Sequence, residues 1–272
     1  MSKNTADIPA LSLRSISKSY DSRPVLTGLS MDFFSGTAYC LMAPSGSGKT
    51  TLFRLILGLE SPDRGEVLFK GSLRRPQISA VFQEDRLLEG FSAVENLFFA
   101  LGNRYSKETL TTSLLRLLPA DALEKPVCEF SGGMKRRLSV LRALLSPAEI
   151  ILMDEPFTGL DPATKQAVID LINELCSGKL LIASTHAKED AVLLNAKIIL
   201  LLQKCPPTHD AELRIMRWWA LVFLSPIPHK LPFQPFHMPE IDHKHRSTRK
   251  QPGRHIHIHQ HPIARKHPDT IR

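Results

Sequence analysis

Residues 43–50 combine small side chains, a lysine and a hydroxyl in the order that suits a phosphate-binding loop. Gly46 and Gly48 let the backbone approach an anion closely, so that successive N–H groups can face its oxygens. Lys49 offers a cation to the outer phosphates, and the Thr50 hydroxyl can ligate Mg²⁺. Ala43 stands where the strict pattern has glycine, which we expect to be tolerated if its φ stays negative. The predicted contacts with a nucleoside triphosphate are Ala43, Pro44, Ser45, Gly46, Ser47, Gly48, Lys49, Thr50 and Thr51.

Two carboxylates follow a mainly apolar run, 148–153, about a hundred residues further along the chain. Such a run is typical of a parallel strand that is covered on both faces, and functional groups gather at the carboxyl ends of such strands. Asp154 can hold Mg²⁺, and Glu155 can polarise an attacking water. Two surface acids after a strand are the alternative. The phosphate-binding loop in the same chain favours the catalytic interpretation.

The segment Phe130-Ser131-Gly132-Gly133-Met134, taken with Lys49 and the two carboxylates, resembles the signature of the ATP-binding subunits of ABC transporters. Further motifs of that family follow in order, and the resemblance covers residues 11–202. It implies ATP and Mg²⁺ as cofactors and two copies of the chain at each closed site. The positions to which it assigns roles are Tyr20 (stacking on adenine), Gln83 (Mg²⁺ and catalysis), Asp161 (a loop across the dimer), His186 (the γ-phosphate), and Ser131, Gly132, Gly133 and Met134 (the γ-phosphate of the opposite subunit).

The resemblance and the residues give one predicted site. Its catalytic residues are Glu155, His186 and Gln83, and its metal ligands are Thr50, Gln83 and Asp154. The chain departs from the family pattern at Met134, where glutamine is usual, and at Ala187, where aspartate often follows the histidine.

Several of these residues also have a structural interpretation. Ser131 can cap a helix that runs to Leu145, because a serine side chain accepts a bond from a free N–H of the first turn. Asp161, followed by a proline, can cap a second helix. Tyr20 can pack on the sheet instead of stacking on a base, and both interpretations stay open.

The order of elements predicts an α/β fold, a P-loop NTPase core with a mainly parallel sheet. Apolar strands alternate with helices: strand 38–42, a helix from Thr51 to Leu57, helix 163–177, strand 179–184, helix 187–195 and strand 197–202. Residues 11–34 suit an antiparallel edge subdomain, and residues 66–82 suggest two more strands. Helical spacing from Ser92 to Leu118 predicts a small helical subdomain, about 84–145. We therefore expect an ATP-binding domain over residues 1–202.

The composition changes after residue 202. Residues 203–272 hold 10 of the 11 histidines, 12 of the 35 Lys and Arg, and only 5 of the 27 Asp and Glu. The high overall charge therefore belongs to this tail and gives no ground for expecting a nucleic-acid partner. We expect the basic, His- and Pro-rich tail to be disordered, and we hypothesise that the reading frame shifted near residue 203. A metal- or partner-binding tail is the alternative.

The predicted function is that of an ATP-hydrolysing subunit of an ABC importer, active as a homodimer with a separate membrane permease and, indirectly, a solute-binding protein. Residues 83–88 resemble the nitrate, sulfonate and taurine importer group. Dispersed cysteines and a polar start predict a cytoplasmic chain, which the separate permease would hold at the cytoplasmic face of the membrane as a peripheral protein. The alternatives are a soluble ABC ATPase acting on nucleic acid or ribosomes, and a nucleotide-binding module that does not hydrolyse.

Overall fold

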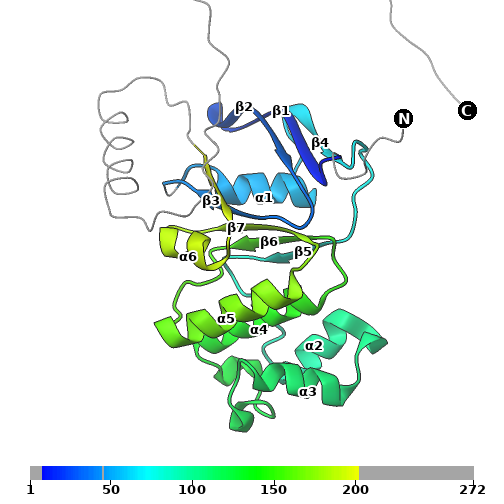
Figure 1. Ribbon diagram of the computed structural model, residues 1–272, viewed down its shortest axis with the longest axis vertical. Coiled ribbons are helices and arrows are strands. Elements are labelled where there is room, and N and C mark those ends of the chain that lie inside the picture. The colour runs from blue at the N-terminus through cyan, green and yellow to red at the C-terminus, as the bar shows by residue number, and fades with distance from the viewer. Residues whose placement is uncertain (1–7, 45, 202–272) are drawn as a thin grey trace, which may run out of the picture. The chain divides into compact units, whose positions relative to one another are not determined.

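The computed structural model describes residues 8–44 and 46–201, which form two β-sheets flanked by helices (Figure 1). Ser45 and the predicted tail, 203–272, lie outside the described residues. The strands are β1 (Leu11–Tyr20), β2 (Arg23–Phe33), β3 (Ala38–Met42), β4 (Arg64–Phe69), β5 (Ile78–Val81), β6 (Ile150–Asp154), β7 (Leu180–Ser184) and β8 (Lys197–Leu200). The helices are α1 (Lys49–Leu57), α2 (Ala93–Leu101), α3 (Lys107–Leu115), α4 (Gly132–Leu145), α5 (Pro162–Leu175) and α6 (Lys188–Leu193).

The larger sheet is parallel, with the strand order β5-β6-β7-β3-β8. Every residue of β6 and β7 is buried, which explains why both strands are apolar up to their last residues, Asp154 and Ser184. Successive side chains point to opposite faces, and so they enter two different cores. Leu41 joins the core formed with α1 and the antiparallel sheet, whereas its neighbour Cys40 joins the core formed with α4 and α5. Figure 1 shows these helices on opposite sides of the sheet, which confirms the predicted α/β fold.

The smaller sheet is antiparallel, with the order β2-β1-β4. A tight turn at Asp21 and Ser22, both with positive φ, joins β1 to β2. Gly65 of β4 has a φ of 83° and lies so close to β1 that a Cβ would come within 2.2 Å of the Arg14 carbonyl oxygen, so glycine is needed there. The two strands predicted within residues 66–82 belong to different sheets: β4 lies in the antiparallel sheet and β5 in the parallel sheet.

The region predicted to be helical from Ser92 to Leu118 forms two helices, α2 and α3. Each begins at a serine cap, and Ser92 forms a capping box with Glu95. Gly102, with positive φ, follows α2 and separates the two helices. Their buried leucines belong to the same apolar core as α4, so the start of α4 is positioned by this packing.

Two of the helices that follow predicted functional loops, α4 and α5, begin at side-chain caps. Ser131 accepts a hydrogen bond from the Met134 N–H at the start of α4, and Asp161 accepts one from Thr164 at the start of α5, as predicted. Helix α1 begins at Lys49, two residues before the predicted start, because the chain already turns helical after Gly48. In the part of the chain that the structure describes, no helix has the length and hydropathy needed to cross a bilayer.

Candidate nucleotide and hydrolysis site

The loop between β3 and α1 has the backbone geometry of an anion cradle. Gly46 and Gly48 have φ values of 78° and 91°, in the left-handed region that glycine adopts without strain. A Cβ on Gly48 would also come within 2.9 Å of the Val25 side chain. Ala43 is fully buried and is not among the described residues with positive φ, so the condition for tolerating alanine is met.

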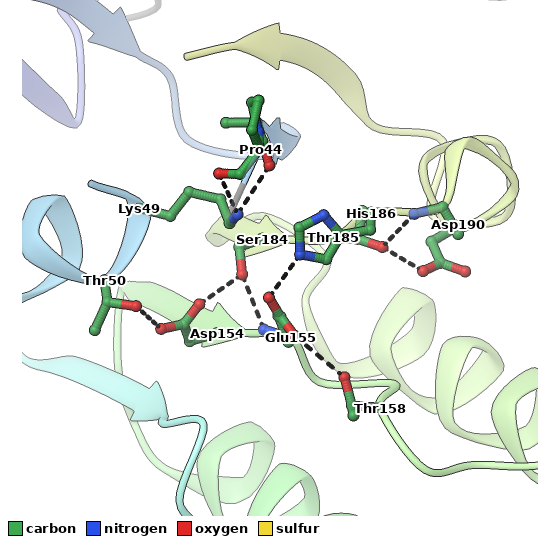
Figure 2. A network of polar contacts seen from close by, with 12 residues as sticks. Pro44, Lys49, Thr50, Asp154, Glu155, Thr158, Ser184, Thr185, His186 and Asp190 are labelled. Carbon is green, nitrogen blue, oxygen red and sulfur yellow. Dashed lines mark hydrogen bonds and ion pairs between the residues drawn. The ribbon is translucent and has the colours of Figure 1, made fainter. Parts of the chain in front are cut away.

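Lys49 is buried at the start of α1, and its ammonium group donates to the Ala43 carbonyl at 3.0 Å and to that of Pro44 at 3.5 Å (Figure 2). Burial lowers the pKa of Lys49, and the charges of Glu155 and Asp154 oppose that shift. The Ser47 hydroxyl is buried and makes no hydrogen bond to the described residues. A buried cation and an unsatisfied hydroxyl in one glycine-rich loop fit a bound phosphate.

Asp154 and Thr50 lie together, although 104 positions separate them in the chain. The Thr50 hydroxyl donates to Asp154 Oδ2 at 2.7 Å, and the Ser184 hydroxyl donates to Oδ1 at 2.6 Å. The described residues contain no cluster of three or more His, Cys, Asp or Glu side chains suited to a metal. Mg²⁺ needs no such cluster beside phosphates, because it binds few protein ligands and keeps several waters. A hydroxyl and a carboxylate next to the phosphate cradle therefore fit Mg²⁺.

Glu155 and His186 are in direct contact, with 2.8 Å between Glu155 Oε1 and His186 Nε2 (Figure 2). Glu155 follows β6 and His186 lies two residues after β7, and the register of these neighbouring strands pairs Asp154 with Ser184. Glu155 has a φ of 51°, unusual for a residue with a side chain, and its N–H donates to Ser184 Oγ at 2.9 Å. The Thr158 hydroxyl donates to its other carboxylate oxygen at 3.4 Å. Strand pairing thus brings the predicted base and the predicted phosphate-contacting histidine together.

Gln83 lies just after β5, which neighbours β6, and is exposed. Its backbone is held from α4: Arg136 donates at 2.6 Å to both the Phe82 and the Gln83 carbonyls. Arg142, six residues further along α4, donates to the Asp85 and Arg86 carbonyls. The loop that carries Gln83 is therefore fastened to the helix that Ser131 caps.

Tyr20 lies at the turn between β1 and β2 with 39% of its surface exposed. Its hydroxyl donates to Glu60, and the Lys18 ammonium lies 5.5 Å from the centre of its ring. An exposed, oriented ring is compatible with stacking on a base. That role stays a prediction.

The residues predicted to act across a dimer lie at two helix starts. Ser131, Gly132 and the backbone of Gly133 form the start of α4, where Ser131 and Gly132 are exposed. A Cβ on Gly133 would lie 3.4 Å from the Gly159 carbonyl oxygen, so this helix start adjoins the loop before Asp161. Asp161 is exposed, and the hydrogen bonds from Thr164 lower its pKa. None of the described hydrogen bonds joins these residues to Lys49, Asp154 or Glu155.

Ser184 is a further candidate site residue, to which the sequence interpretation assigned no role. It is fully buried, donates to the Asp154 carboxylate and accepts from the Glu155 N–H, so it ties that carboxylate to the backbone of Glu155. The available signal was a hydroxyl residue at the carboxyl end of an apolar strand. Its importance depends on the β6–β7 register, which the sequence alone does not reveal.

A parallel sheet, a glycine-rich loop before a helix and a paired carboxylate and hydroxyl at the strand ends define a P-loop NTPase. Residues 26–158 match the family described as ABC transporter. The chain is 35% identical over 205 residues to the Nod factor export ATP-binding protein I of Rhizobium sp. (strain N33), covering 71% of this chain and 67% of that protein. The same protein of Sinorhizobium fredii (strain NBRC 101917 / NGR234) is also 35% identical, with 70% of this chain and 59% of that protein covered. The chain therefore belongs to the ABC transporter family as an ATP-binding subunit, while spanning about two thirds or less of these relatives.

Solved structures agree with this assignment. A dimeric ATP-binding cassette in a post-hydrolysis state with ADP and Pi is 27% identical, with a TM-score of 0.62. The match includes 70% of this chain and 93% of that structure's chain. A bacterial Atm1-family ABC exporter with ATP bound has a TM-score of 0.67 over 80% of this chain and 43% of that one; at 22% identity it supports the fold alone. The predicted fold and the predicted enzyme class, an ABC-type ATPase, are thus confirmed.

Proposed function

We propose that this chain hydrolyses ATP as a head-to-tail homodimer and thereby drives a separate membrane permease. The observation that carries the proposal is the contact between Glu155 and His186 beside the buried Lys49 and the Thr50–Asp154 pair. Within one site, Lys49 supplies a cation, Thr50 and Asp154 supply metal ligands, and Glu155 supplies a base. The exposed start of α4 supplies the missing side of the site when it comes from a second copy.

Each residue then has a defined task. Lys49 and the N–H groups of its loop hold the outer phosphates, and Tyr20 stacks on the adenine. Mg²⁺, held by Thr50, Asp154 and Gln83, would neutralise the charge that develops between the β- and γ-phosphates. The Glu155 carboxylate accepts a proton from a water molecule while the water oxygen bonds to the γ-phosphorus. The bond between the γ-phosphorus and the β-phosphate oxygen breaks, giving ADP and phosphate.

His186 is placed to serve both the base and the substrate. Its Nε2 atom contacts Glu155, and the side chain is 44% exposed, so it can also reach a γ-phosphate. The contact argues against a module that binds nucleotide without hydrolysing it, because a general base must be oriented to work.

The second copy contributes Ser131, Gly132 and Gly133. A serine hydroxyl and free N–H groups at a helix start bind an anion well, and this start is exposed. Asp161 lies on the neighbouring loop and would face the same partner. The dimeric cassette with ADP and Pi, to which this chain is similar, supports a homodimer.

An exposed aromatic patch beside the Gln83 loop suits the permease. The patch consists of Leu88, Phe91, Phe98 and Phe99, each more than two-fifths exposed, and Phe99 packs edge-on against both other rings. Large exposed apolar groups that cluster are typical of protein–protein contacts. Docking there would place the chain at the cytoplasmic face of the membrane and would join the permease to the loop that carries Gln83.

The direction of transport has two candidates. Import, with a solute-binding protein, is supported by the resemblance of residues 83–88 to the importer group. Export is supported by the names of the relatives, which are Nod factor export proteins. A gene for a solute-binding protein beside the permease gene would support import, and a permease gene without one would support export.

A mixing experiment tests the dimeric mechanism. Ser131→Arg blocks the helix start, Glu155→Gln removes the base, and each variant alone should lose ATP hydrolysis. A mixture should regain activity, because a heterodimer contains one site with neither change. Two samples of the same variant mixed together serve as the control. Absence of recovery, with activity strictly linear in protein concentration, would mean that each monomer works alone.

A further inference from the structure

Asp190 is a buried carboxylate close to the hydrolysis site, and the roles assigned above do not use it. It is 2% exposed, lies in α6 and comes four residues after His186. Its Oδ2 atom accepts a hydrogen bond from the Thr185 hydroxyl, and its Oδ1 atom forms an ion pair with Lys165 of α5 (Figure 2 shows the first contact). A buried charge is costly unless it is paired, so these two partners are needed to keep Asp190 in place.

The Thr185 hydroxyl connects Asp190 to both sides of His186. It donates to the carboxylate, and it accepts a hydrogen bond from the Ala187 N–H at 3.1 Å. Thr185 precedes His186 and Ala187 follows it, so one buried hydroxyl fixes the backbone around the histidine. Ala187 begins the turn into α6 without a side-chain cap of its own, and its N–H bond to this hydroxyl supports the turn.

Packing restrains the His186 ring only in part. The side chain is 44% exposed and borders a pocket of about 190 Å³, lined also by Phe157, Lys165 and Asp190. A ring with this much free space can adopt other rotamers, so its 2.8 Å contact with Glu155 depends on where the backbone places it. Figure 2 shows His186 between Glu155 on one side and the Thr185–Asp190 pair on the other.

We propose that Asp190 is a positioning residue for ATP hydrolysis, acting through Thr185 to set His186 against Glu155. Lys165 links this arrangement to α5, the helix that Asp161 caps. The Lys165 contact is an ion pair without hydrogen-bond geometry, so Thr185 is the directional partner. The inference rests on the proposed function, because it assigns Asp190 a role in the same hydrolysis step.

The first test compares steady-state ATP hydrolysis by full-length variants. Thr185→Val removes the hydroxyl and nearly keeps the shape, Thr185→Ser keeps the hydroxyl, and Asp190→Asn removes the charge. We expect kcat to fall about 10–100-fold for Thr185→Val and Asp190→Asn with little change in KM, since a misplacement of about 1 Å costs on this order. Thr185→Ser should recover most of the lost rate. Glu174→Gln is the matched control, because this exposed carboxylate of α5 pairs only with Arg116 among the described ion pairs.

The second test separates positioning from a general structural role. Asp190→Asn is combined with His186→Gln, and kcat is compared with that of His186→Gln alone. If Asp190 acts through His186, the second change should add less than about twofold. An equal loss in both backgrounds, or a lower melting temperature with unchanged kcat, would overturn the inference. If His186→Gln itself keeps full activity, the proposed hydrolysis mechanism is wrong as well.

Discussion

Replacing Arg136 by methionine tests how much the contacts between α4 and the loop that carries Gln83 contribute to stability. Arg136 donates to two backbone carbonyls at 2.6 Å and forms an ion pair with Asp85 at 3.3 Å. Its side chain is 8% exposed and that of Asp85 is 20% exposed, so the change removes the ion-pair partner of a largely buried carboxylate, while the charges of Lys135 and Arg142 remain nearby. Hydrogen bonds from a charged group contribute about 1.5–3 kcal/mol each, and breaking a buried pair costs about 3–5 kcal/mol. The terms overlap, so we expect Arg136→Met to lower the free energy of unfolding by about 3–5 kcal/mol.

Urea unfolding followed by circular dichroism measures this loss. Arg116→Met is the matched control, because it also removes an arginine that pairs with a carboxylate, Glu174, but at a site where both side chains are about half exposed. Exposed pairs contribute about 0–1 kcal/mol, so the control should stay near the parent. Equal losses for the two variants would refute the idea that burial makes the Arg136 contacts strong.

A double-mutant cycle with Asp85→Asn isolates the ionic part. In the Asp85→Asn background, Arg136→Met no longer leaves a buried charge without its ion-pair partner. The loss in the free energy of unfolding caused by Arg136→Met should therefore be about 1–3 kcal/mol smaller there than in the parent. The two carbonyl bonds account for what remains. Additive effects would show that Arg136 stabilises the loop through the carbonyls alone.

Three further predictions follow from the site. Glu155→Gln should keep ATP binding but lower turnover about 10²–10⁴-fold. The control Glu149→Gln changes a glutamate just before the first residue of β6 and should leave turnover unchanged. Comparable turnover for the two variants would show that Glu155 is not the base. Lys49→Ala should weaken ATP binding about 10–100-fold, measured by calorimetry, and an unchanged affinity would mean that Lys49 does not face the phosphates. Burial raises the pKa of Asp85 above its ordinary value of 3.8, against the effect of Arg136, so the stability that Asp85 contributes is greatest below that pH and is lost as pH rises through the folded-state pKa. The stability of the parent relative to Asp85→Asn should therefore fall above pH 3.8, and parallel pH curves would contradict this.

The parts of the fold that the sequence predicts are those with a strong local pattern. The strands at 38–42, 150–154 and 180–184 are apolar apart from the final residues Asp154 and Ser184, and Ser131 and Asp161 are typical helix caps. Both kinds of element therefore lie within a few residues of their predicted bounds. The start of α1 was predicted two residues late, because the apolar pattern begins at the side chains that face the core. The backbone, however, turns helical directly after Gly48.

Contacts between strands are what the sequence leaves open. Glu155 and His186 are 31 positions apart, and their meeting depends on the pairing of Asp154 with Ser184. A shift of β7 by one residue would turn Ser184 away from Asp154, since neighbouring side chains point to opposite faces. The same register gives Ser184 its bond to the Glu155 N–H, which helps to hold that residue at positive φ. The roles of Ser184, Thr185 and Asp190 therefore became visible only with the fold.

The two departures from the family pattern near the reacting groups have different structural consequences. At Ala43 the backbone needs no glycine, because φ is not positive there and the methyl group joins the core formed with α1. At Ala187 the side chain can make no polar contact, but its N–H bonds to Thr185, and the buried Asp190 supplies a carboxylate from the following helix. Of these two alanines, only Ala43 is hydrogen-bonded to one of the reacting groups, because its backbone carbonyl accepts from Lys49. A different side chain at Ala43 would leave that bond in place. The departures therefore do not favour a module that has lost hydrolysis, and the Glu155–His186 contact favours one that retains it.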